Sequence, residues 1–325
     1  MEGIIKPKAL QKGDTIAIIA PSEPINKSQL EKTRRFLENT GYKVKAGENV
    51  LAAIGDYVAG TPAQRSADFN WAFADPEVKA VFMAVGGFGA GQILDKIDFS
   101  VIRANPKIFV GYSDATTLQL AMLAETCLLT FHGPNAISLP DFRPAGYTMS
   151  NFWRQLSAPE GEIQPKTTVV QPQSVWQEIR PGKGEGILFG GNLSCISKLL
   201  GTRWDPLPAL DKHFGPDAKY LLFWEEDYEQ FSEIMRSLWQ IRNTGFFAKL
   251  SGMIVGKLTA VAEVDYRVFP TKKELIREIT EPFGIPVLYG VDFGHEVPRA
   301  TFPIGVRAMM DAKEKKLEIL EAAVV

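Results

Sequence analysis

The sequence Gly111-Tyr112-Ser113-Asp114-Ala115 places a serine between an apolar run and a stretch with helical spacing. A serine at such a strand-to-helix turn presents its hydroxyl group at a helix N-terminus, as the nucleophile of many acyl-transfer enzymes does. The helix dipole would favour negative charge there, and the backbone N–H of Asp114 would point into the same space. The alternative is that Ser113 or Asp114 only caps the helix.

A glycine-rich turn, Gly86 to Gly91, follows another apolar run and also precedes a helical stretch. A dinucleotide fingerprint that starts at Gly87 would need a glycine at position 92, which is Gln92, and no Gly-Lys-Ser/Thr follows for a P-loop. The turn nevertheless brings backbone N–H groups close to any ligand because no Cβ intervenes. It can bind a phosphate, a carboxylate or a developing oxyanion, or it can serve only as a tight turn.

A serine nucleophile needs a base, and the chain has only three histidines. His213 lies in a polar stretch, which favours a solvated surface position. His132 follows an apolar run and can be either catalytic or structural. His295 follows Gly294 at the end of a strand-like segment, where an exposed catalytic ring would fit.

An acidic group follows the apolar run Leu221–Trp224, which delivers Glu225, Glu226 and Asp227 together. The carboxyl ends of strands are where α/β sheets place their active sites. One of these carboxylates could therefore orient the imidazole of a catalytic histidine. Metal binding is the competing interpretation, but the sequence has neither His-Glu-x-x-His nor a paired histidine spacing.

The elements that must position these groups alternate between strands and helices from residue 15 to residue 131. Continuous apolar runs predict strands buried on both faces, and helices begin near Ser28 and at Thr61-Pro62. Such an alternation is typical of a doubly wound parallel sheet in an α/β domain. The predicted strands are Thr15–Ala20, Val78–Val85, Lys107–Val110 and Leu128–Phe131.

Prolines and glycines interrupt this rhythm between residues 138 and 186. We therefore predict an α/β domain over residues 1–150, a linker over 151–180 and a second domain over 181–325. The second domain should be β-rich and should end in a hairpin that pairs 306–310 with 317–320. It would supply the acid and the histidine.

The composition excludes several classes of protein. A net charge of −2, from 36 basic and 38 acidic residues, argues against a nucleic-acid-binding surface. Two cysteines cannot form a disulfide framework, and the first residues do not have the pattern of a signal peptide. The run Thr15–Ala20 is too short to span a membrane. We expect a cytoplasmic protein that binds neither nucleic acid nor a membrane.

Together these motifs resemble the serine LD-carboxypeptidase family, which includes muropeptide LD-carboxypeptidases and microcin C immunity peptidases. The resemblance runs over nearly the whole chain and includes the serine turn, the glycine turn, the acidic strand end and the last histidine. Further matching motifs are Ala20-Pro21-Ser22, Gly60-Thr61, His132-Gly133-Pro134, Gly190-Gly191-Asn192-Leu193, Gly201-Thr202, Asp292-Phe293-Gly294-His295 and Phe302-Pro303-Ile304-Gly305.

The resemblance implies a serine-type carboxypeptidase with a catalytic triad of Ser113, His295 and Glu225. It also implies an oxyanion hole formed by the backbone N–H groups of Gly87 and Asp114. Members of this family have an N-terminal α/β domain and a smaller C-terminal β-rich domain, and they are typically cytoplasmic homodimers. They act on small peptides, including murein tetrapeptide, and need no metal or organic cofactor.

One departure leaves the substrate open. Muropeptide-cleaving members carry an arginine just before the Gly-Gly turn, whereas Val85 stands here, as an apolar residue does in the microcin-immunity branch. That branch hydrolyses peptidyl- or aminoacyl-nucleotide amides and stacks a loop tryptophan on the base. Trp176 is therefore a candidate substrate contact, although it can equally be a packing anchor. A non-catalytic protein that binds a small anion is the alternative of another class.

Overall fold

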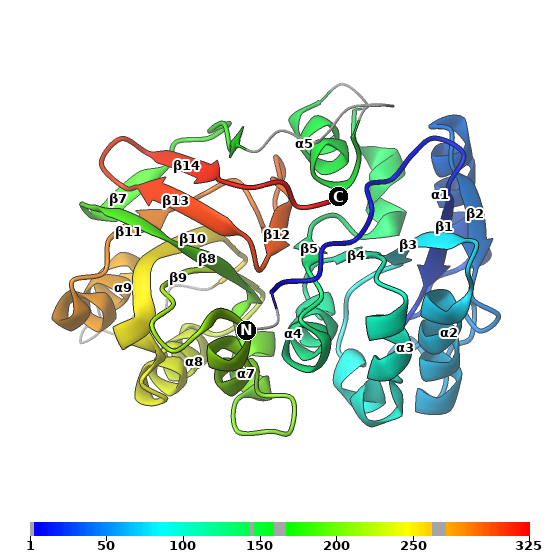
Figure 1. Cartoon of the computed structure of the whole chain (residues 1–325), viewed down its shortest axis with the longest axis horizontal. Helices are drawn as coiled ribbons and strands as arrows, with labels where there is room; N and C mark the ends of the chain where they lie inside the picture. The colour runs from blue at the N-terminus through cyan, green and yellow to red at the C-terminus, as the bar shows by residue number, and fades with distance from the viewer. Residues whose placement is uncertain (1–2, 144–145, 159–166, 262–270) are drawn as a thin grey trace. The chain divides into compact units, whose positions relative to one another are not determined.

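The computed structural model describes residues 3–143, 146–158, 167–261 and 271–325. The chain divides into two compact units, drawn together in Figure 1. The N-terminal unit comprises Gly3–Gln164 with Thr301–Pro303 and Ala323–Val325. The C-terminal unit comprises Pro165–Ala300 with Ile304–Ala322.

The N-terminal unit is built on a six-stranded sheet with the order β12-β5-β4-β3-β1-β2. The pairs β1–β2, β1–β3, β3–β4 and β4–β5 are parallel. Parallel strands need crossover connections, which the intervening helices provide. The strands are β1 (Thr15–Ile19), β2 (Lys43–Ala46), β3 (Val78–Met83), β4 (Ile108–Gly111), β5 (Thr130–His132) and β12 (Phe302–Ile304).

Helices pack on both faces of this sheet. In Figure 1 α2, α3 and α4 lie side by side below it, and α1 and α5 lie above it. Capping boxes at Asn26 and Thr61 satisfy the first N–H groups of α1 and α2. The helices are α1 (Lys27–Asn39), α2 (Pro62–Ala74), α3 (Phe99–Ala104), α4 (Ala115–Thr126) and α5 (Tyr147–Leu156), with 3₁₀ turns η1 (Ala90–Lys96) and η2 (Ala136–Asp141).

The C-terminal unit contains a mixed eight-stranded sheet with the order β6-β14-β13-β8-β9-β10-β11-β7. Its four central strands, β8 to β11, run parallel, and antiparallel strands flank them on both sides. The strands are β6 (Thr168–Val169), β7 (Gln177–Arg180), β8 (Lys183–Asn192), β9 (Tyr220–Asp227), β10 (Leu250–Thr259), β11 (Val287–Tyr289), β13 (Arg307–Asp311) and β14 (Lys316–Ile319).

Short helices complete the C-terminal unit. They are α6 (Leu193–Leu199), α7 (Pro206–Phe214), α8 (Phe231–Asn243) and α9 (Lys272–Thr280), with 3₁₀ turns η3 (Phe246–Lys249) and η4 (Glu281–Phe283). Within the described parts of the chain, none of the helices combines the length and the apolar character needed to cross a membrane.

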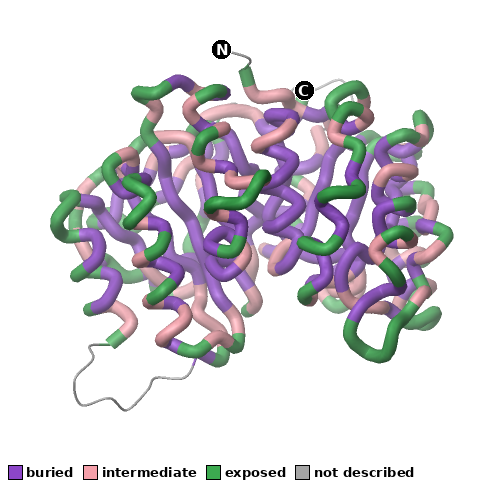
Figure 2. The backbone as a smooth tube through the Cα atoms, turned by 90° about the horizontal axis from the view of Figure 1, so that it is seen from below, coloured by how far each residue is buried: buried purple, intermediate pink, exposed green. Residues whose placement is uncertain are grey.

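Helix α4 is the most deeply buried helix near the predicted nucleophile. Ten of its 12 residues are buried, so the helix is packed on every side. In Figure 2 the buried stretches follow the strands, and the exposed residues gather on the outer helices and turns. A helix packed on all sides cannot shift without disturbing the core, and the residues at its N-terminus are therefore held in place.

The predicted fold class is confirmed: one sheet is mainly parallel and doubly wound, and the other belongs to a β-rich unit. The predicted hairpin is also present as β13 and β14. Several elements escaped prediction, and for two of them the physical reason is plain. Edge strand β2 has no buried residue, and β8 contains four glycines, so neither presents an apolar run. The segment expected as a linker, 151–180, contains the end of α5 together with β6 and β7.

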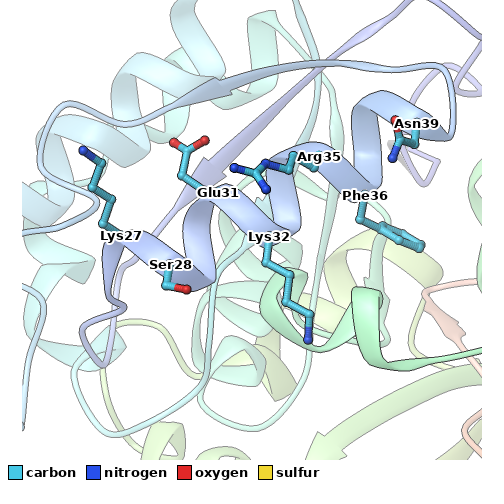
Figure 3. A pocket seen from close by; sticks show the side chains of 7 residues that line it. All are labelled: Lys27, Ser28, Glu31, Lys32, Arg35, Phe36 and Asn39. Carbon is cyan, nitrogen blue, oxygen red and sulfur yellow. The ribbon is translucent and has the colours of Figure 1, made fainter.

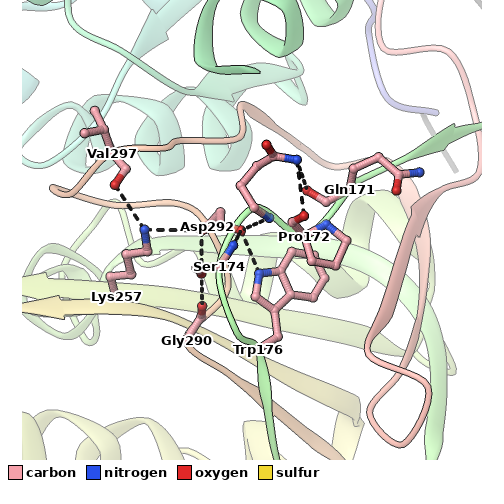
Figure 4. A network of polar contacts seen from close by, with 9 residues as sticks. Gln171, Pro172, Ser174, Trp176, Lys257, Gly290, Asp292 and Val297 are labelled. Atoms are coloured by element: carbon pink, nitrogen blue, oxygen red, sulfur yellow. Dashed lines mark hydrogen bonds and ion pairs between the residues drawn. The ribbon is translucent and has the colours of Figure 1, made fainter. Parts of the chain in front are cut away.

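The buried carboxylate of Asp292 fixes residues 171–176 to the C-terminal unit, as Figure 4 shows. Its Oδ2 accepts hydrogen bonds from the backbone N–H groups of Gln173 (2.7 Å) and Ser174 (3.1 Å) and from Nε1 of Trp176 (2.8 Å). Its Oδ1 accepts from the Ser174 hydroxyl (2.6 Å) and lies 3.2 Å from Nζ of Lys257. One side chain therefore orders a segment more than 110 residues away in sequence.

We predict that Asp292→Asn lowers the free energy of unfolding at pH 7 by about 3–5 kcal/mol, because the amide offers a donor where the carboxylate met only donors. Burial would raise the pKa of Asp292, but the hydrogen bonds from Ser174, Gln173 and Trp176 and the contact with Lys257 outweigh it and lower the pKa. A lowered pKa stabilises the fold above the unfolded value of about 4, and this stability is lost as the pH falls through the folded value.

Chemical denaturation at pH 7 and at steps below pH 4 would measure this effect. The difference between the wild type and Asp292→Asn should shrink as the pH falls. The exposed Asp217→Asn variant is the matched control and should leave the denaturation midpoint unchanged. An unchanged midpoint for Asp292→Asn would show that the network contributes nothing to stability.

Candidate active site

Ser113 occupies a strained turn between β4 and α4. Its φ angle is +63°, in the left-handed region that non-glycine residues rarely adopt. A Cβ at Gly111, the last residue of β4, would lie only 2.8 Å from the Cβ of Ala115. The turn is therefore tight on both sides of the serine. The half-buried side chain of Ser113 lies at the N-terminus of the buried helix α4.

The glycine turn packs directly against this serine. A Cβ at Gly86 would lie 3.0 Å from Oγ of Ser113, so a larger residue would press on the hydroxyl group. Gly87 has a φ angle of +123°, and a Cβ there would lie 2.4 Å from Cγ of Glu23. These positions require glycine for conformation and for close approach. The two motifs identified in the sequence thus meet in the N-terminal unit.

The side chain of Asp114 joins the two turns. Its buried Oδ2 accepts hydrogen bonds from the Ser22 hydroxyl (2.5 Å) and from the backbone N–H of Ala90 (2.8 Å), where the glycine turn enters η1. Burial raises the pKa of Asp114, and these bonds together with the nearby Arg65 charge oppose that rise. Sequence reasoning considered the side chain of Asp114 only as a helix cap, and it makes no capping hydrogen bond.

Arg65 is a second residue that sequence reasoning missed. Its side chain is buried, and Nη1 donates to the carbonyl oxygens of Pro21 (2.7 Å) and Gly89 (2.6 Å). Its Nε donates to the carbonyl oxygen of Gly60 (3.2 Å). One guanidinium group therefore holds three loops around the glycine turn. A single arginine in a helical stretch forms no recognisable motif, so the sequence gave no signal of this role.

In the C-terminal unit, Glu225 and His295 form a close pair. Oε2 of Glu225 lies 2.6 Å from Nδ1 of His295, and the glutamate side chain is fully buried on β9. Gly294 has a φ angle of +102°, and a Cβ there would lie 3.0 Å from Oε2 of Glu225. The glycine before the histidine thus allows the backbone to pass close to the acid. A carboxylate at Nδ1 fixes the ring and stabilises its charged form.

The neighbouring acids have different surroundings. Glu226 is buried and accepts hydrogen bonds from Nδ2 of Asn192 (2.8 Å) and from the backbone N–H of Ser194 (2.8 Å), at the start of α6. Asp227 instead places Oδ2 3.5 Å from Nε2 of His295. Burial alone would lower the pKa of His295, but the hydrogen bond and charge of Glu225 and the charge of Asp227 outweigh it and raise the pKa.

The other two histidines are both buried. His132 is 1% exposed on β5. His213 is 2% exposed on α7, so the predicted surface position of His213 is wrong. Asp205 and Pro206 are a helix-start signal that the sequence does contain, and the helix turns His213 toward the core.

Trp176 lies 1% exposed beneath residues 171–174, with its indole N–H bonded to Asp292 (Figure 4). This placement is that of a packing anchor, since neither ring face is open to a nucleobase.

One hollow in the described part of the chain contains none of these candidates. It measures about 710 Å³ and runs along the outer side of α1, as Figure 3 shows. All of its lining residues come from that single helix, so no second element supplies converging groups. Three of these residues are cationic. The lining residues are Lys27, Ser28, Glu31, Lys32, Arg35, Phe36 and Asn39.

The predicted site residues therefore form two groups. The N-terminal unit brings together Ser113, Asp114 and the turn at Gly87. The C-terminal unit brings together Glu225 and His295.

Comparisons with known proteins cover both groups. The family model described as the LD-carboxypeptidase N-terminal domain matches residues 16–133, and the one described as the LD-carboxypeptidase C-terminal domain matches residues 185–310. A probable murein peptide carboxypeptidase from Bacillus subtilis is 38% identical over 98% of this chain and 95% of its own length. The microcin C7 self-immunity protein MccF from Escherichia coli is 30% identical over 96% of this chain and 94% of its own.

Solved structures give the same result. MccF in complex with glutamyl sulfamoyl guanosine matches with a TM-score of 0.84 at 25% identity, covering 98% of this chain and 99% of that one. The muramoyltetrapeptide carboxypeptidase from Oxalobacter formigenes matches with a TM-score of 0.77 at 26% identity, covering 94% and 97%. These relatives favour an enzyme over a non-catalytic anion-binding protein. The chain belongs to the LD-carboxypeptidase family and is a hydrolase of the carboxypeptidase type.

Proposed function

We propose that the protein hydrolyses an amide bond through an acyl-enzyme formed on Ser113, with His295 as the base and Glu225 as the residue that orients it. The observation that carries the proposal is the strained Ser113 turn at the N-terminus of α4, since φ = +63° is a conformation that a helix cap does not need. The 2.6 Å contact between Glu225 and Nδ1 of His295 supports the choice of base, because a carboxylate at Nδ1 favours the tautomer whose Nε2 accepts a proton.

In the first step Ser113 Oγ attacks the scissile carbonyl carbon while Nε2 of His295 takes the hydroxyl proton. The backbone N–H groups of Gly87 and Asp114 stabilise the negative oxygen of the tetrahedral intermediate. The intermediate then collapses, the C–N bond breaks, and His295 returns its proton to the leaving amine. Water attacks the ester in the second half-reaction, with the same base, and releases the free acid and Ser113.

The substrate we propose is a small murein peptide, cleaved at the bond between an L centre and a C-terminal D residue. The names of two relatives support this class, the probable murein peptide carboxypeptidase and the muramoyltetrapeptide carboxypeptidase. Cleavage of murein tetrapeptide with release of its last residue, followed by mass spectrometry, is the direct test.

A second substrate class has specific support. Val85 stands before the glycine turn, where the resemblance associates an apolar residue with hydrolysis of aminoacyl-nucleotide amides. MccF, whose structure has been solved with glutamyl sulfamoyl guanosine, also gives a high TM-score. Turnover of an aminoacyl sulfamoyl adenosine without turnover of murein tetrapeptide would assign the protein to this class.

We also propose that the protein acts as a homodimer in the cytoplasm, on the basis of the family resemblance. Light scattering after size-exclusion chromatography would test the dimer, and a monomeric mass would reject it.

Ser113→Ala should lower kcat on the cleaved substrate by about 10⁶, because the nucleophile is lost while the binding groups remain. A serine-directed phosphonate should label the wild type on the peptide that contains Ser113 and should leave the variant unlabelled. The exposed Ser28→Ala variant is the matched control. Cleavage by Ser113→Ala at the wild-type rate would exclude the mechanism.

The pH dependence should reflect the raised pKa of His295. The base acts when neutral, so kcat/KM should rise with pH through an apparent pKa above the ordinary value of about 6.5. Asp227→Asn removes a negative charge near Nε2 and should move this acidic limb to lower pH. Glu296→Gln, an exposed neighbour, is the control and should move the acidic limb less.

The ring signals of only three histidines also allow a direct titration by NMR. A limb that moves to higher pH in Asp227→Asn would contradict the assignment.

The Asp114 carboxylate should matter more for kcat than for KM, because it ties the serine turn to the glycine turn. Asp114→Ala should lower kcat by about 10²-fold with little change in KM, whereas Asp114→Asn keeps an acceptor for the N–H of Ala90 and should retain most activity. Thermal unfolding of both variants would separate a loss of fold from a loss of geometry. Asp95→Ala, an exposed residue of η1, is the control. Equal kcat for Asp114→Ala and Asp95→Ala would contradict this role.

A further inference from the structure

Two large aromatic side chains are exposed beside the glycine turn. Phe88 is 69% exposed and directly follows Gly87, and Tyr57 is 59% exposed on the preceding loop. Their ring centroids lie 5.9 Å apart with an interplanar angle of 9°, so the rings stack on each other. Neither ring belongs to the triad or the oxyanion hole proposed above.

The backbone beneath each ring is fixed. Tyr57 lies in a turn closed by a bridge between Ile54 and Val58, and the next N–H, that of Ala59, donates to the carbonyl oxygen of Ser22 (2.8 Å). On the other side Phe88 is flanked by Gly87 and Gly89. A Cβ at Gly89 would lie 3.3 Å from Cγ1 of Val58, so the two segments are in close contact.

Arg65 connects the same two segments. Its guanidinium group donates to the carbonyl oxygen of Gly60, three residues after Tyr57, and to that of Gly89, one residue after Phe88. The aromatic pair is therefore held on a buried hydrogen-bond network and does not depend on a flexible loop. Rings that are held in place lose little further freedom when a ligand binds, which favours affinity.

The pair also lies close to the proposed nucleophile. Gly86 touches Ser113, and Phe88 is two residues further on, which corresponds to at most about 7 Å of extended chain. A group that stacks on Phe88 is therefore close enough to belong to the same ligand as a bond under attack at Ser113. Exposed, parallel aromatic rings bind the flat faces of other rings, by stacking on a heterocycle or by contact with the C–H face of a sugar.

We propose that Tyr57 and Phe88 form a substrate subsite for a ring that the substrate carries outside the scissile bond, either a sugar ring that contacts them through its C–H face or a nucleobase that stacks on them. The subsite rests on the proposed hydrolase function, since it assumes that the ligand also reaches Ser113. It extends that function by assigning the ring-bearing part of the substrate to two named side chains.

The test uses two pairs of substrates that differ only in the ring. One pair is murein tetrapeptide with and without its muramyl sugar, and the other is an aminoacyl sulfamoyl adenosine and the matching methyl aminoacyl sulfamate. Phe88→Ala and Tyr57→Ala should lower kcat/KM on the ring-bearing member of one pair by about 5- to 150-fold and leave its ring-free partner unchanged. The affected pair identifies the ring as a sugar or a nucleobase. Phe283→Ala, a partly exposed phenylalanine of the C-terminal unit, is the matched control.

Three outcomes would overturn the subsite. They are an equal loss on both members of a pair, no loss on any substrate, and a change in oligomeric state that accounts for the loss. If the wild type hydrolyses none of the four compounds, the proposed function fails on these substrates, and calorimetry on Ser113→Ala still tests the subsite. In that background Phe88→Ala should weaken binding of a ring-bearing ligand about 5- to 150-fold, and unchanged binding would reject it.

Discussion

The buried carboxylate of Asp114 is the constraint on which the N-terminal half of the site depends. A carboxylate removed from water needs donors, and here they come from the side chain of Ser22 and the backbone N–H of Ala90. Asp114 directly follows the strained serine. Its hydrogen bond with the N–H of Ala90 therefore fixes the glycine turn beside Ser113. Glu225 acts similarly in the C-terminal unit, where its buried carboxylate lies 2.6 Å from Nδ1 of His295 and holds the imidazole in place.

These arrangements show which features of the site can be predicted from the sequence and which require the structure. The serine turn was predictable because β4 is a continuous apolar run and the helix follows at once, so local pattern suffices. The acid and His295 were likewise marked by strand ends and a neighbouring glycine. Local pattern could not have revealed the partners of Asp114, one of which is 92 residues away, or the contact between Asp227 and His295. Such contacts are set by the order of strands in a sheet, which no short segment encodes.

The failures of local prediction have physical causes as well. His213 was placed on the surface because its neighbours are polar, although Asp205 and Pro206 start a helix that carries its inner face to the core. Trp176 lies in a proline-rich stretch, and there the deciding partner, Asp292, comes from the far end of the same unit. In both cases the side chain is covered by residues that are distant in the sequence, so its immediate neighbours do not reveal that it is buried.

The path of the chain through the two units has a practical consequence. Thr301–Pro303 and Ala323–Val325 belong to the N-terminal unit although more than 130 residues of the other unit precede them, and β12 supplies an outer strand of the N-terminal sheet. Neither unit is thus a contiguous stretch of sequence. A gene cut at the apparent boundary would yield an N-terminal fragment with one strand missing and an unpaired sheet edge next to β5, which is a surface prone to aggregation. Expression of either half alone is therefore a poor route to a soluble fragment, and a circular permutant that joins the two termini would keep both units whole.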